Sequence, residues 1–178
     1  MSGLVEIGVG PPIVALGVSF AGSDAHRLLA VRFRVVALEA EDDAAAAAAR
    51  FVAESGLEQV GFLGVGAAAS AEALLAAAEA GERARSIVLA SPGPPPADPR
   101  LLKIPKAVLI GTDDPAQPPD AVATWRAALP GCHVVLIYEG GGDVAAIRPR
   151  AFAEAAGDFL ERQGRFGFMT GSVAISPG

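Results

Sequence analysis

This chain of 178 residues has few of the residue types that form metal sites, disulfides or nucleic-acid-binding surfaces. Cys132 is its only cysteine, so an intrachain disulfide is impossible and a cysteine-rich metal site is excluded. Lys103 and Lys106 are its only lysines, and the net charge is −6, so the basic footprint of a nucleic-acid-binding surface is missing. We therefore expect no metal, no cofactor and no nucleic acid among its ligands.

Long hydrophobic runs are missing as well. No stretch approaches the roughly 20 apolar residues that a transmembrane helix needs, and the N-terminus lacks a basic segment followed by an apolar run. We therefore expect a cytoplasmic protein that does not contact membranes. The chain is 52% hydrophobic and 19% charged, which is the balance of a globular domain, and it is long enough to bury a sizeable core.

Short apolar runs of β-type composition alternate with alanine-rich helical runs. The β-type runs are apolar throughout, which is typical of parallel strands covered by helices on both faces. We predict strands over Ile13–Ser19, Phe33–Glu39, Gln59–Gly64, Ser86–Ala90, Lys106–Ile110 and Cys132–Tyr138. We predict helices over Ser23–Val31, from a cap at Asp42 or Asp43 to Ser55, and over Ala67–Ala80, Pro119–Leu129 and Ala146–Arg162. The predicted fold is α/β: a three-layer sandwich around a mostly parallel sheet of about six strands.

The two ends of the chain fit this alternation less well. Leu4–Gly8 is a candidate edge strand. Phe166–Ile175 is an apolar, β-prone run that can pair at a sheet edge, exchange with a partner chain or be flexible. We therefore predict a single domain over residues 1–164 and an apolar tail over residues 165–178, with a homo-oligomer as a possible assembly.

The most informative segment is Phe62–Ala69 (FLGVGAAA), which ends a strand, turns on glycine and opens a helix. This is the context of the nucleophile elbow G-x-S-x-G, in which serine stands at the apex of a sharp strand-to-helix turn. Gly66 takes the place of that serine. A glycine at such a turn also has a simpler explanation, because it accepts positive φ without strain.

Three later segments follow in the order of a hydrolase: ARSIVLASP, then IPKAVLIGTDDPAQPP, then LPGCHVVLIYEGGGDVAAIRPRAFAEAAGDFLER. With these segments the chain resembles the α/β-hydrolase family from about Pro12 to Arg162, in the family order of nucleophile, acid and histidine. The resemblance implies that Asp114 stands at the position of the acid, which orients an imidazole and stabilises it when protonated.

The resemblance also implies where the histidine belongs. Gly142 falls at that position, and a shift of one residue would place Asp143 there instead. Neither residue can act as an imidazole base near neutral pH. A carboxylate of Asp143 near Asp114 would form a pair in which like charges raise one pKa, an arrangement suited to a cation or a polar ligand.

Val18-Ser19, followed by Phe20, stands where many relatives carry His-Gly. In the family, the oxyanion hole uses backbone N–H groups from this loop and from the residue after the nucleophile, here Phe20 and Ala67. Ala67 opens a helix, and a helix N-terminus favours negative charge. The resemblance therefore implies a set of ligand-binding residues: Ser19, Phe20, Val65, Ala67 and Asp143.

Residues 91–103 form a short, proline-rich bridge where many relatives insert a helical lid. We predict a lidless protein whose pocket is shallow and open.

Three interpretations follow. The first is a relative without the triad that binds a small molecule or a protein partner. The alternative is an active hydrolase of esterase or acyl-transfer type with relocated groups, for instance Ser19 or Ser70 served by His26. A third is an engineered chain in which glycine replaces serine and histidine, although Val18-Ser19 and the missing lid favour natural divergence.

Overall fold

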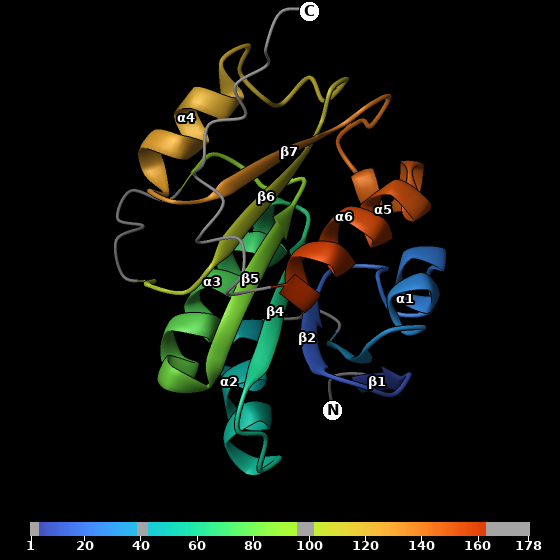
Figure 1. Ribbon diagram of the computed structural model, residues 1–178, viewed down its shortest axis with the longest axis vertical. Helices are drawn as coiled ribbons and strands as arrows, with labels where there is room; N and C mark the ends of the chain where they lie inside the picture. Colours follow the sequence, from blue (N-terminus) through green and yellow to red (C-terminus); the bar gives the residue numbers. More distant parts are fainter. Residues whose placement is uncertain (1–3, 39–42, 96–101, 163–178) are drawn as a thin grey trace, which may run out of the picture.

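The computed structural model describes residues 4–38, 43–95 and 102–162, which form one sheet with helices on both faces (Figure 1). The strands are β1 (Leu4–Ile7), β2 (Pro12–Leu16), β3 (Arg34–Leu38), β4 (Val60–Val65), β5 (Ala84–Ala90), β6 (Lys106–Gly111) and β7 (His133–Ile137). The helices are α1 (Asp24–Leu29), α2 (Ala44–Glu54), α3 (Ala67–Ala80), α4 (Ala121–Ala128), α5 (Val144–Ile147) and α6 (Pro149–Arg162), with a 3₁₀ turn η1 (Gly81–Arg83). The predicted three-layer α/β sandwich is confirmed.

The sheet has seven strands in the order β1-β3-β2-β4-β5-β6-β7. Neighbouring strands from β3 to β7 are parallel, whereas β1 pairs antiparallel with β3. The candidate edge strand at residues 4–8 is therefore present, as β1. With it the sheet has seven strands, one more than the six predicted apart from this candidate. Because parallel strands end at one edge of a sheet, the loops that follow β2, β4, β5, β6 and β7 all lie at that edge.

The sheet separates two hydrophobic cores. On one face α1, α5 and α6 cover the sheet, and Phe152 of α6 shares a core with Leu63 of β4. On the other face α2, α3 and α4 cover the sheet, and Trp125 of α4 shares a core with Phe62 of β4. Consecutive strand residues point to opposite faces, so Phe62 and Leu63 enter different cores. Burial on both faces explains why the strands are apolar throughout.

The closing helix predicted over Ala146–Arg162 is two helices instead. Pro149 begins α6, because proline has no N–H to donate and its ring is tolerated only in the first turn of a helix. The shorter α5 starts earlier than predicted, after Asp143, whose carboxylate accepts a hydrogen bond from the N–H of Ala146 at 3.0 Å. The predicted helix over Pro119–Leu129 likewise begins later, at Ala121.

Residues 91–105 connect β5 to β6, and their described parts, 91–95 and 102–105, contain no helix. None of the described helices combines the length and the apolar character needed to cross a membrane. The predicted tail over residues 165–178 lies outside the described residues, as do Glu39 and Asp42.

Candidate functional site

The turn between β4 and α3 has Gly66 at its apex, with φ 93° and ψ 167°. This backbone region is essentially restricted to glycine. The Gly66 N–H donates to the carbonyl of Ala90 at 2.8 Å, and the Gly66 carbonyl accepts from the N–H of Ser70 at 2.9 Å. A Cβ built on Gly66 meets no atom within 4 Å. The sharp turn that the motif predicts is thus present, with open space and no side chain at its apex.

Gly64 lets the strand and the helix of this turn approach each other closely. A Cβ on Gly64 would lie 2.6 Å from the Cα of Ser70 and 2.7 Å from the carbonyl oxygen of Ala69. The Ser70 side chain is buried, and its hydroxyl donates to the Gly64 carbonyl at 3.3 Å. This buried hydrogen bond of Ser70 therefore stabilises the turn between β4 and α3.

The loop after β2 lies against the end of β4. A Cβ on Gly17 would lie 3.1 Å from the Cβ atoms of both Phe20 and Val65, which places these two predicted ligand-binding residues side by side. The N–H of Phe20 donates a long hydrogen bond, 3.4 Å, to the carbonyl of Gly17. The N–H of Ala67 precedes the first i→i−4 hydrogen bond of α3, so the helix itself gives it no acceptor.

His26 is fully buried in α1. Its Nδ1 accepts a hydrogen bond from the N–H of Gly22 at 2.9 Å, and its ring packs 5.4 Å from the ring of Phe20. Burial lowers the pKa of His26, since the charged imidazolium would lose its hydration, and the backbone of Val35 offsets this only in part. Ser19 is exposed, with φ 61°. The contacts described for His26 thus involve backbone and aromatic groups and neither serine of the relocated pair.

Asp114 follows β6 and is buried, with 8% of its surface exposed. Its Oδ1 accepts a hydrogen bond from the N–H of Ala116 at 2.9 Å. A Cβ built on Gly142 would lie 3.5 Å from that same oxygen. The carboxylate of Asp143 instead caps α5 and is exposed. Of the two sequence alternatives, Gly142 is therefore the residue whose side chain would face Asp114.

The loop after β5 ties these parts together, and its residues did not enter the sequence-based site. Ser91 is buried in a left-handed conformation, with φ 47°, and its hydroxyl accepts from the N–H of Val144 at 2.9 Å. A Cβ on Gly93 would lie 3.1 Å from the Cβ of Ala67. Gln117, in the loop that follows β6, donates to the carbonyl of Pro92 at 2.7 Å. The position of Ser91 directly after a buried strand was the signal available in the sequence.

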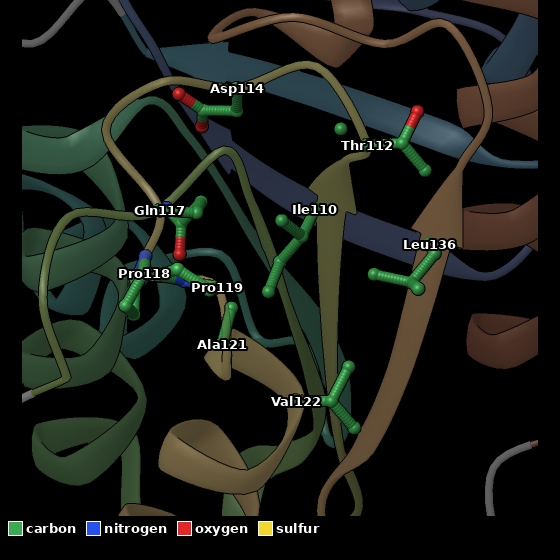
Figure 2. A pocket seen from close by; sticks show the side chains of 10 residues that line it. Ile110, Thr112, Asp114, Gln117, Pro118, Pro119, Ala121, Val122 and Leu136 are labelled. Carbon is green, nitrogen blue, oxygen red and sulfur yellow. The ribbon is translucent and has the colours of Figure 1, made fainter.

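A half-open pocket of about 270 Å³ lies beside the loop that follows β6, between β6, β7 and the start of α4 (Figure 2). Of the predicted site residues it includes Asp114. Its lining comprises Ile110, Gly111, Thr112, Asp114, Gln117, Pro118, Pro119, Ala121, Val122 and Leu136. The described residues contain no group of three or more His, Cys, Asp or Glu side chains that could hold a metal ion.

No protein-family profile matches this sequence, and a search of curated proteins finds no match. Solved structures, in contrast, match the fold over most of the chain.

One similar structure is MGS-MChE2, an α/β-hydrolase enzyme from the metagenome of lagoon sediments of Mar Chica, Morocco, with a TM-score of 0.73 at 19% identity over 89% of this chain and 94% of that one. A second is CarC, a serine hydrolase involved in carbazole degradation, with a TM-score of 0.75 at 16% identity over 91% and 95% of the two chains. A thermophilic esterase from Thermogutta terrifontis gives a TM-score of 0.75 at 14% identity over 90% and 93%. The likeness covers about nine tenths of this chain, so this protein has the α/β-hydrolase fold.

Proposed function

We propose that this chain is a hydrolase-fold protein that binds a small molecule without serine-triad catalysis. The observation that carries the proposal is the apex of the β4–α3 turn. There Gly66 adopts a backbone conformation essentially restricted to glycine and has no side chain with which to attack a substrate.

The neighbourhood of Asp114 supports the same proposal. The carboxylate accepts a hydrogen bond from the N–H of Ala116. The residue whose Cβ would face it is Gly142, which has no side chain. A buried carboxylate without an imidazole has no base to orient. It can still accept hydrogen bonds from a ligand, and the N–H of Ala67 at the start of α3 favours a polar or anionic group. These groups are suited to binding and lack the nucleophile and base of acyl transfer.

The test is an esterase assay on the purified protein. We expect p-nitrophenyl acetate and p-nitrophenyl butyrate to be hydrolysed no faster than in buffer, and a serine-directed fluorophosphonate to leave the protein unlabelled. Turnover that the fluorophosphonate blocks would overturn the proposal.

If such turnover were found, the alternative would be an active hydrolase with relocated groups. Ser19→Ala, Ser70→Ala and His26→Asn would then be measured one at a time. Loss of turnover in one serine variant and in the histidine variant would identify that pair.

A further inference from the structure

The strand β7 forms one edge of the sheet (Figure 1), and among the described residues it pairs with β6 alone. The N–H of Thr112 donates to the carbonyl of Ile137 at 3.0 Å, so the backbone N–H and C=O of Ile137 point toward β6. The backbone groups of successive strand residues point to opposite sides of the strand. Those of Val134 and Leu136 therefore point away from β6, toward the outer edge.

The outer edge of β7 carries none of the side chains that commonly protect an edge strand from pairing with another strand. Such protection comes from charged side chains and from proline. The strand reads HVVLI, without Lys, Arg, Asp, Glu or Pro. The opposite edge does have a charge, because Glu6 of β1 pairs with Arg34 at 2.7 Å. On β7 the side chain of Leu136 is instead 53% exposed, so this edge is suited to pairing with a further strand.

The hand of the chain connections argues against the apolar run Phe166–Ile175 as a parallel neighbour of β7. The connections that advance toward β7 through α2, α3 and α4 place each helix in the core that contains Phe62. The helix α6 lies in the opposite core, which contains Leu63. A parallel strand that followed α6 on the outer side of β7 would therefore need a connection of the opposite hand. About 98% of such connections share one hand.

An antiparallel neighbour from the same run would have to start at the far end of β7. The ring of Phe159, in the last turn of α6, lies 5.7 Å from the ring of His133, which begins β7. An antiparallel strand would begin beside Ile137, so the chain would first have to run the length of β7, about 15 Å. A strand from a second copy of the chain meets neither obstacle.

We propose that two copies of this chain associate through their β7 strands, paired antiparallel about a twofold axis at Val135. In this register Val134 lies opposite Leu136 of the partner subunit. These residues have outward-pointing backbone groups, so they exchange both N–H···O hydrogen bonds, and the symmetry repeats the exchange. The sheets of the two copies become one continuous sheet. This assembly is independent of the proposed function, since it uses neither the β4–α3 turn nor Asp114.

The same register covers the apolar side chains of the edge. Val134 and Leu136 lie on the α4 face, because their register partners Val108 and Ile110 belong to the core that α4 covers. A twofold axis perpendicular to the sheet keeps like faces together, so Val134 packs beside Leu136 of the partner subunit as a cross-strand pair. The pairing thus removes the exposed surface of Leu136 from water, which favours association.

The test of the register is disulfide cross-linking of the full-length protein carrying Cys132→Ala. At the twofold axis Val135 faces its own counterpart in a non-hydrogen-bonded pair, with Cα atoms about 4.5 Å apart, within the range of a disulfide. Val135→Cys should therefore form a covalent dimer in a glutathione redox buffer. Val134→Cys is the matched control, because its counterpart lies about 8 Å away, too far for a disulfide.

Non-reducing gel electrophoresis measures the covalent dimer, and we expect at least tenfold more of it from Val135→Cys than from Val134→Cys. Equal cross-linking of the two variants, or none in either, overturns the proposed pairing.

Sedimentation velocity on the unaltered protein measures the association itself. We expect a dimer whose population rises with concentration. Leu136→Lys places a charge against the apolar edge of the partner and should raise the dimer Kd at least tenfold, whereas Leu75→Lys on the exposed surface of α3 leaves it unchanged. A monomer up to the highest soluble concentration overturns the proposal.

A dimer that Leu136→Lys leaves intact and that Val135→Cys does not cross-link also overturns it, because the copies then meet elsewhere, as in an exchange of Phe166–Ile175. Circular dichroism checks that each variant is folded. Should Leu136→Lys not fold, the comparison of the two cysteine variants decides.

Discussion

Gly64 and Gly66 stand two positions apart in the β4–α3 turn, and each must be glycine for a different physical reason. At Gly64 the obstacle is space, because a Cβ would penetrate the backbone of Ser70 and Ala69. At Gly66 the space is open and the obstacle is the backbone, whose φ of 93° L-residues rarely adopt. Replacing each glycine by alanine therefore tests the two reasons separately.

Gly64→Ala should lower the free energy of unfolding by about 3 kcal/mol or more, since a rigid helix backbone must move. Gly66→Ala should cost about 1–3 kcal/mol, from backbone strain alone. Urea denaturation followed by circular dichroism measures both. Gly142→Ala is the control and should stay within about 0.5 kcal/mol, because its φ is not positive and the nearest atom lies at 3.5 Å. A Gly64→Ala protein as stable as the control contradicts the close approach.

Gly142→His tests whether a side chain at position 142 faces the carboxylate of Asp114. A carboxylate within a few ångströms favours the protonated ring, so the pKa of the introduced imidazole should rise above its ordinary value of about 6.5. NMR titration of the ring C–H protons measures it. With Asp114→Asn in the same chain the rise should disappear. An elevated pKa that survives the removal of this charge would assign it to another group.

Among the elements, α1 shows how a residue that suggests catalysis can be structural. The helix begins after Ser23, whose hydroxyl accepts from the N–H of His26 at 3.1 Å, and it buries the imidazole against Phe20. The Nδ1 atom accepts from Gly22, so the ring is held as the neutral tautomer that keeps its proton on Nε2. Because the ring is buried in its neutral form, the contribution of His26 to the free energy of unfolding depends on pH.

The folded pKa of His26 is lowered, whereas the unfolded chain titrates near its ordinary value of 6.5. The unfolded state therefore binds more protons just below that value, and the contribution of His26 to stability is complete above it and is lost as the pH falls through the folded pKa. We expect the urea concentration at the unfolding midpoint to decrease as the pH is lowered from 7 to 5, about the range in which histidine titrates. His26→Asn keeps an acceptor for Gly22 and should flatten this part of the profile. An identical slope in both proteins would show that other groups cause it.

At the scale of the whole molecule, two cores share one sheet, and each strand contributes to both. Trp125 is the only tryptophan and lies in one core, whereas Phe152 lies in the other. Since β4 to β6 connect the two cores, loss of either should unfold both, as in a single cooperative domain.

Phe152→Ala should lower the free energy of unfolding by about 3–5 kcal/mol. The loss should be the same by tryptophan fluorescence, which reports on the opposite core, and by far-ultraviolet circular dichroism. Two separated transitions would mean that the faces unfold independently. Exposed Leu75→Ala serves as the matched control and should move neither probe appreciably.

Much of this molecule could be predicted from local patterns. Continuous apolar runs of five to seven residues indicated buried parallel strands, and glycines and prolines marked where they ended. One error was also local, because Pro149 divides the closing helix. The edge strand β1 was predicted as a candidate, since it is short and mostly exposed. The likeness to hydrolases came from the order of segments and could not show which of Gly142 and Asp143 faces the acid.

The sequence by itself determined the α/β architecture, because this depends on short-range periodicity, and it has glycine at positions 66 and 142, where the resemblance implies serine and histidine. Only the tertiary structure decided that Gly142 faces Asp114, that His26 is buried against Phe20, and that a pocket opens beside Val122. These features join loops and helices that are far apart in the chain. Their distances are set by strand register and by the packing of helices on the sheet, which no local pattern specifies.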